Sequence, residues 1–155
     1  MTVNDSIFGD LVNDYGWSRV ITINFFGRET EIDLIIDVDE DGQFDEGPYE
    51  AYQSLVKNWD NIQSSLLDSI LDYYIQKRHK LGYDIEVNEN YLLVETTDQI
   101  IKMISIDGIV VLYVDIFEGR DIRITFNCTW DAENGLGLRL INEKVMEVGY
   151  QDIAI

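Results

Sequence analysis

The chain has 155 residues, 46% of them hydrophobic, with 30 acidic and 11 basic side chains and a net charge of −19. These values predict a single domain spanning residues 1–155 with an apolar core, and they exclude global disorder. Short apolar runs exclude a transmembrane helix, the N-terminus lacks signal-peptide features, and the only cysteine, Cys128, excludes an internal disulfide, so we expect a cytoplasmic protein.

The negative charge is concentrated at the two ends of the sequence. Residues 1–47 carry 12 acids and 2 bases, residues 48–80 carry 4 of each, and residues 81–155 carry 14 acids and 5 bases. We expect such a field to repel nucleic acid and anionic membranes and to attract cations or a basic protein surface. Solubility alone is the alternative explanation.

Two strands are predicted near the N-terminus, over residues 20–26 and 30–38, around the turn Gly27-Arg28-Glu29. In the second strand apolar and acidic residues alternate, which predicts a half-buried strand with one wet, acidic face. The apolar positions are Ile32, Leu34, Ile36 and Val38, and the alternating positions are Glu31, Asp33, Ile35 and Asp37.

The stretch Asp37-Val38-Asp39-Glu40-Asp41-Gly42 follows and spells D-x-D-x-D-G, the first half of a calcium-loop signature. In the calcium hypothesis, Asp37, Asp39 and Asp41 supply side-chain oxygens and Gln43 a backbone carbonyl. Position twelve is Pro48, where an EF-hand has a bidentate Glu. The alternative is an acidic turn that favours the positive end of the next helix and faces a basic protein. The residues predicted to bind that partner are Asp37, Asp39, Glu40, Asp41, Asp45 and Glu46.

A long helix is predicted to begin with Pro48 at its first position. Asp60 with Gln63 resembles a capping pair, which predicts a break near Asn58. Basic residues 77–80 crowd the expected end before Gly82, where they complement the helix dipole. Apolar residues recur at helical spacing at Tyr52, Leu55, Val56, Trp59, Ile62, Leu66, Leu67, Ile70, Leu71, Tyr74 and Ile75.

The rest of the chain is predicted to be mainly β. Short strands are expected at 84–87 and 91–95, and Thr96 with Gln99 is expected to cap one helical turn. Asp107-Gly108 predicts a hairpin turn between strands at 104–106 and 109–117. Residues 121–130 alternate cleanly, and strands at 136–141 and 145–148 surround another turn. The expected fold class is therefore α+β: a mainly antiparallel sheet, made of an N-terminal hairpin and a C-terminal meander, packed against one long central helix.

No catalytic residue is predicted. His79 is the only histidine and lies in the basic helix end, and Cys128 alternates with core residues on its strand. No phosphate loop is present, because Gly135-Leu136-Gly137 lacks a further glycine and a following helix. A small hydrolase built on a carboxylate pair is the alternative that spacing leaves open.

The C-terminal segment resembles a bacterial family of small proteins classed as domains of unknown function. The resemblance rests on residues 128–137, with Trp130-Asp131-Ala132-Glu133-Asn134-Gly135-Leu136-Gly137, and on Val148-Gly149-Tyr150-Gln151-Asp152. Asn134 stands where the family usually has histidine, which weakens a metal or catalytic role. Such genes often lie near toxin–immunity loci, so the resemblance implies an immunity-like binding role by association.

These residues also predict local structure. Trp130 is expected in the core, and Asp131, Glu133 and Asn134 in a turn that Gly135 closes. The side chains of Gln151 and Asp152 are expected to tie the last strand to that turn through hydrogen bonds. The leading functional hypothesis is a non-enzymatic acidic protein that binds a basic protein partner, with no bound cofactor. A calcium-binding module over residues 37–45 is the alternative.

Overall fold

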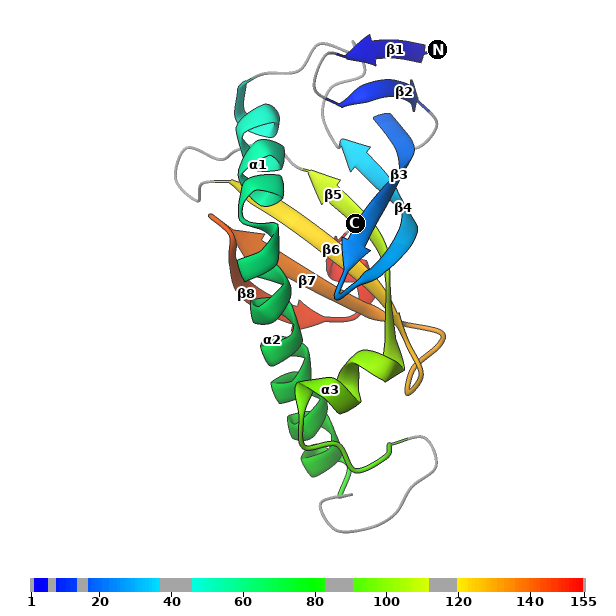
Figure 1. The fold of residues 1–155 in the computed structure, drawn as a ribbon. Helices are drawn as coiled ribbons and strands as arrows, with labels where there is room; N and C mark the ends of the chain where they lie inside the picture. Colours follow the sequence, from blue (N-terminus) through cyan, green and yellow to red (C-terminus); the bar gives the residue numbers. More distant parts are fainter. Residues whose placement is uncertain are drawn as a thin grey trace.

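The computed structural model describes residues 2–5, 8–13, 17–36, 46–82, 91–111 and 120–154 (Figure 1). In chain order the elements are β1 (Thr2–Asp5), β2 (Gly9–Asn13), β3 (Trp17–Phe25), β4 (Arg28–Ile36), α1 (Glu46–Lys57), α2 (Trp59–Lys80), α3 (Thr97–Ile100), the 3₁₀ helix η1 (Ile101–Met103), β5 (Ile104–Val111), β6 (Asp121–Cys128), β7 (Leu136–Ile141), β8 (Lys144–Gly149) and the 3₁₀ helix η2 (Gln151–Ala154).

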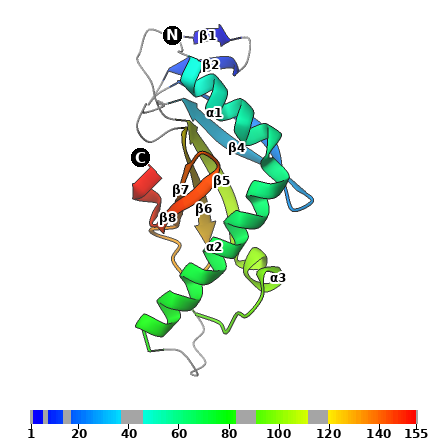
Figure 2. The same ribbon diagram turned by 90° about the vertical axis from the view of Figure 1, so that its left-hand side faces the viewer.

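The eight strands form one sheet in which each strand pairs with its neighbours in sequence. Every pair is antiparallel except β4 with β5, which are parallel and are joined by the helical crossover. Helices α1 and α2 run end to end along one face of the sheet, and the C-terminal η2 lies beside β7 (Figure 2). This arrangement confirms the predicted α+β class.

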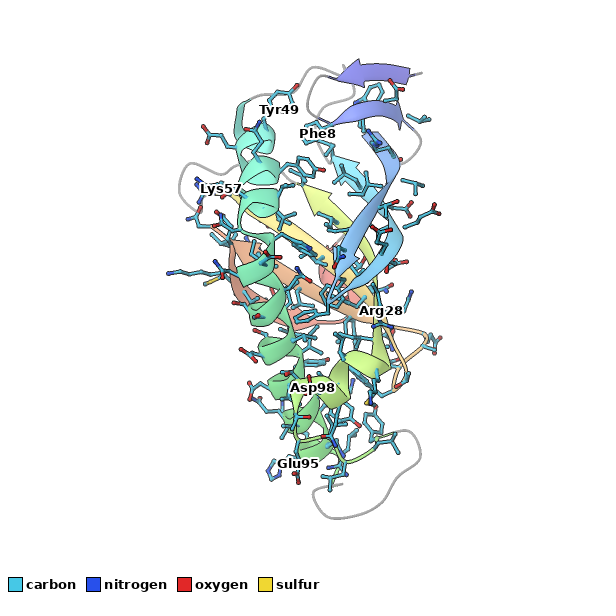
Figure 3. The ribbon with its side chains drawn as sticks, in the orientation of Figure 1. Phe8, Arg28, Tyr49, Lys57, Glu95 and Asp98 are labelled. Carbon is cyan, nitrogen blue, oxygen red and sulfur yellow. The ribbon has the colours of Figure 1, made fainter. Side chains whose placement is uncertain are left out.

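The core lies between the helices and the inner face of the sheet. Apolar side chains from both layers form one buried cluster. Phe8, which precedes β2, stacks on Tyr49 of α1 with ring centroids 5.1 Å apart and also contacts Tyr52, so aromatic packing holds α1 against the N-terminal strands (Figure 3). The fully buried members include Leu34, Ile36, Leu55, Leu66, Ile70, Tyr74, Ile109, Ile124, Phe126 and Leu138.

The predicted break in the central helix is confirmed at Asn58. This residue lies between α1 and α2 with φ −103° and ψ 13°, and its side-chain amide donates to the Ser54 carbonyl oxygen at 2.9 Å. Two details of the prediction are wrong. Pro48 lies two residues inside α1. Asp60 and Gln63 do not cap α2, because both lie within the helix: its N-cap residue is Asn58, and the Gln63 amide bonds to the Asp60 side chain at 3.4 Å rather than to a free backbone group.

Gln63 is a buried polar side chain that ties α2 to the β3–β4 hairpin. Its carbonyl oxygen accepts the backbone N–H of Phe26 at 2.8 Å. The hairpin itself closes through Phe26 and Gly27, both in the left-handed region with φ of 51° and 83°. Phe25 therefore pairs with Arg28, and the turn is one residue earlier and shorter than predicted.

The hairpin predicted at Asp107-Gly108 is wrong. Residues 104–111 form the single strand β5, and the register with β6 shifts between Ile106 and Gly108, which marks a β-bulge at Asp107. A side chain at Gly108 would meet the backbone oxygen of Asp33 on β4 at 3.2 Å. The glycine therefore permits close approach of β5 to β4 rather than a chain reversal.

The predicted strand at 91–95 is also wrong, because these residues form no regular element; the one predicted at 84–87 lies outside the described residues. Arg78 lies in the last turn of α2, as predicted, where it is buried and donates to the Tyr91 carbonyl at 3.0 Å. The capping box of Thr96 and Gln99 is confirmed, since each side chain accepts a backbone N–H of the other.

Candidate functional site

The predicted acidic loop lies almost entirely outside the residues that the structure describes. Asp37, Asp39, Glu40, Asp41, Gln43 and Asp45 lie outside the described residues, and Glu46 begins α1 with no described side chain. The calcium and partner-binding hypotheses for this stretch stay predictions. Within the described segments, no three His, Cys, Asp or Glu side chains are grouped so that they could hold a metal ion.

A row of carboxylates is present on β4, the strand that leads into this loop. Glu29, Glu31 and Asp33 are exposed, while the alternating Ile32 and Leu34 are buried against the helices. This confirms the predicted wet, acidic face for residues 31 and 33. Successive side chains on one face of a strand are roughly 7 Å apart, so the three carboxylates form a line on the outer side of the sheet. We call Glu29, Glu31 and Asp33 the acidic face.

Basic side chains do not neutralise the acidic face, although all 11 Lys and Arg residues lie in the described segments. Several are engaged by backbone carbonyls: Arg19 donates to Phe8 at 3.0 Å and Arg28 to Ile101 at 3.3 Å. In the described part of the chain, no ion pair involves an acidic-face residue.

Other cations are engaged by acids outside the acidic face. Arg120 forms two hydrogen bonds with Glu143, at 3.0 and 2.9 Å. Arg139 contacts the buried Asp121 at 3.3 Å, and Arg123 lies 3.5 Å from the same carboxylate. Internal pairing of the arginines leaves the net negative charge of the molecule on exposed carboxylates.

Beside the acidic face, β3 has an open edge. Strand β2 pairs with β3 only at Ser18 and Trp17, whereas β4 pairs with all nine residues of β3. Among the described residues, no strand covers the remainder of β3 on the β2 side. Val20, Thr22 and Asn24 lie along this stretch, and we call these three residues the open edge.

A groove of about 240 Å³ separates the open edge from the helices. At one end of the groove, the indole N–H of Trp59 donates to the Asn24 carbonyl at 2.7 Å and ties α2 to β3. The groove is lined mainly by apolar side chains. These include Ile21, Ile23, Tyr52, Leu55, Val56 and Ile109.

Cys128 and His79, the two side chains considered individually for catalysis, lie in different surroundings. Cys128 is buried, and burial raises the pKa of its thiol, which keeps it protonated and poorly nucleophilic. His79 is exposed on the last turn of α2.

Sequence reasoning missed the environment of Lys77. Its ammonium lies 4.8 Å from the ring centroid of Tyr150 and 5.8 Å from that of Tyr73. Burial lowers the pKa of Lys77, but the neighbouring tyrosines outweigh burial and raise it overall, so the amine stays charged. A protonated amine stabilises the aromatic contact and is not a nucleophile.

The predicted C-terminal turn is confirmed, with a structural role. Trp130 is buried, the backbone N–H of Asn134 donates to the Asp131 carboxylate at 3.1 Å, and Gly135 closes the turn with φ 61°. The amide of Gln151 donates to the Phe126 carbonyl at 2.7 Å, and its backbone N–H donates to the Asn134 carbonyl. Gln151 therefore bonds to the turn through its backbone N–H, and its side chain bonds to β6 instead of the turn, contrary to the prediction. Asp152 is exposed.

The structure contains no helix, among the residues it describes, that is long and apolar enough to span a membrane. No curated protein and no solved structure matches the chain. Residues 7–155 match the family described as "Domain of unknown function (DUF6985)", and the chain belongs to that family.

Proposed function

We propose that this protein is a non-enzymatic binding protein whose acidic face recognises a basic protein partner. The observation that supports this most directly is the line of Glu29, Glu31 and Asp33, which no described cation neutralises. Six further acidic residues, Asp37, Asp39, Glu40, Asp41, Asp45 and Glu46, follow β4 in the sequence. Complementary charge would speed encounter with the partner and make binding sensitive to salt.

Protein is the class of partner that this charge favours. A net charge of −19 opposes approach to nucleic-acid phosphates and to anionic lipid headgroups. The resemblance to proteins near toxin–immunity loci suggests a basic toxin that this protein neutralises. Inhibition of such a toxin would require only that the acidic face cover the toxin's basic functional surface, with no chemical reaction by this chain.

Affinity capture with matched variants tests the proposal. The variant E29Q/E31Q/D33N removes three charges from the acidic face. The control E95Q/E133Q/D152N removes three charges from exposed positions elsewhere, so the two variants have the same net charge. Proteins would be captured from a lysate of the source cells in 50 and 500 mM NaCl and identified by mass spectrometry.

We expect a strongly basic protein to bind the wild type and the control variant in low salt and to be lost from the acidic-face variant. High salt should release it from all three. Equal capture by the two variants would show that only net charge matters, and the assignment to the acidic face would be wrong. Failure of the wild type to retain any basic protein would contradict the binding function itself.

A further inference from the structure

We propose that the open edge of β3 accepts an extended segment of the basic partner as an added β-strand. This inference rests on the proposed function and specifies how the partner is bound. It depends on three features of β3: free backbone groups, an edge without protecting charges, and the position of the edge between the groove and the acidic face.

The register identifies which backbone groups are free. The two-residue turn at Phe26 and Gly27 makes Phe25 and Arg28 a hydrogen-bonded pair. Alternate residues of β3 therefore bond to β4, and the residues between them direct N–H and C=O the other way. Val20, Thr22 and Asn24 are in this second set. The Asn24 carbonyl already accepts the Trp59 indole N–H from that direction, so the groups open to an added strand are those of Val20 and Thr22 and the N–H of Asn24.

The open edge lacks the features that usually prevent strand addition. Exposed edges are commonly blocked by charged side chains, proline or a bulge. Val20 is 58% exposed, and Thr22 and Asn24 are uncharged. By comparison, β8, the last strand of the sheet, carries Lys144 and Glu147 and has a register shift against β7.

The surroundings of the open edge specify the incoming sequence. Side chains of an added strand would alternate between the groove and the outer face of the sheet. Those entering the groove would meet Tyr52, Val56 and Trp59, which favours small apolar residues. Those on the outer face would lie two strand spacings, roughly 10 Å, from β4, a gap that extended Lys or Arg and Glu side chains can span.

Charge excludes a second copy of this chain as the occupant. Pairing of two β3 edges would place two acidic faces close together and join molecules that each carry a charge of −19. On the outer face of the sheet, the acidic face lies directly beside the open edge: Asp33 is opposite Val20, Glu31 is opposite Thr22, and Glu29 is opposite Asn24. The expected ligand is therefore an extended segment in which basic and apolar residues alternate.

Synthetic peptides test strand addition without altering the protein. The probe is the acetylated and amidated octapeptide (Lys-Val)₄, titrated into the full chain by calorimetry in 20 mM NaCl. Two derivatives carry N-methyl groups, one on every lysine amide and the other on every valine amide. Each removes the hydrogen-bond donors along one edge of the peptide strand only.

One derivative should bind at least about tenfold more weakly than the parent peptide, and the other within about twofold. In antiparallel addition the peptide residue opposite Thr22 is a lysine on the outer face, and it bonds to Thr22 directly, so weaker binding of the N-methyl-lysine peptide indicates antiparallel addition. In parallel addition Thr22 bonds to the residues on either side of that lysine, which are valines, so weaker binding of the N-methyl-valine peptide indicates parallel addition. Equal affinity of both derivatives, or equal loss from both, would overturn strand addition.

A protein variant gives a second test. T22P removes an outward N–H that β4 does not use, whereas T22V keeps the N–H and a β-branched side chain. T22P should abolish peptide binding and T22V should retain it. If T22P does not fold, the peptide series still decides.

The outcomes separate the two proposals. Peptide binding that is lost in E29Q/E31Q/D33N yet insensitive to T22P and to N-methylation would overturn strand addition and leave the acidic binding function standing. The same holds if the partner is captured while (Lys-Val)₄ does not bind.

Discussion

Neutralising the middle carboxylate of the acidic face should stabilise the protein. Glu31 lies between Glu29 and Asp33 on the same face of β4, with one intervening residue on each side. In a pleated strand these neighbours are roughly 7 Å away. The variant E31Q keeps the shape of the side chain and removes both close repulsions.

The size of the effect follows from Coulomb's law. Two unit charges about 7 Å apart in water repel by about 0.6 kcal/mol before screening by salt. A Debye length of about 8 Å at 0.15 M reduces this to roughly 0.25 kcal/mol, whereas about 30 Å at 0.01 M leaves roughly 0.5 kcal/mol. With two neighbours, E31Q should gain about 0.5 kcal/mol in 0.15 M salt and about 1 kcal/mol in 0.01 M salt.

Urea unfolding at the two salt concentrations measures the gain. E147Q is the control, because Glu147 lies directly opposite Arg139 and its neutralisation removes an attraction instead of a repulsion. We expect E31Q and E147Q to change the free energy of unfolding with opposite signs. A gain for E31Q that does not depend on salt, or no gain, would refute the description of the acidic face as three unneutralised charges.

Two further predictions concern the C-terminal half. G135A should lower the free energy of unfolding in urea by about 1–3 kcal/mol, because φ is 61° and a new Cβ would lie 2.4 Å from the amide nitrogen of Gln151; an unchanged midpoint would contradict this. For Glu143, burial raises the pKa, but hydrogen bonds from Arg120 and Ser54 outweigh burial and lower it overall. Its contribution of about 1 kcal/mol should be complete above the unfolded-state pKa of about 4.3 and lost as the pH falls through the folded-state value. Urea unfolding of E143Q and wild type should therefore converge in acid, and a constant difference would refute the linkage.

Local signals in the sequence predicted the elements that depend on local interactions. The apolar periodicity of α2, the capping box at Thr96 and the alternation of β6 are each determined within a few residues, and the structure confirms them. The acidic side of β4 was predictable for the same reason, since alternation alone places Glu31 and Asp33 opposite the core.

The errors arise where distant segments decide the conformation. Asp107-Gly108 has the composition of a hairpin turn, but its conformation is set by the close parallel approach of β4. Similarly, the open edge exists because β2 pairs with β3 only as far as Ser18, which alternation within β3 does not encode. The short, polar strands β1 and β2 gave no periodic signal and were not predicted.

The single parallel pair in the sheet has a consequence for synthesis of the chain. Residues 37–103 separate β4 from β5, and a ribosome adding roughly 5–20 residues per second needs several seconds to make them. Throughout that time β4 has one edge without its native neighbour. We expect its like charges to keep nascent chains from pairing with one another, as charged gatekeepers do in other edge strands. If the charges protect the nascent chain, cell-free synthesis of E29Q/E31Q/D33N should scatter more light than synthesis of the wild type. Equal scattering from the two would show that the carboxylates act only in the folded protein.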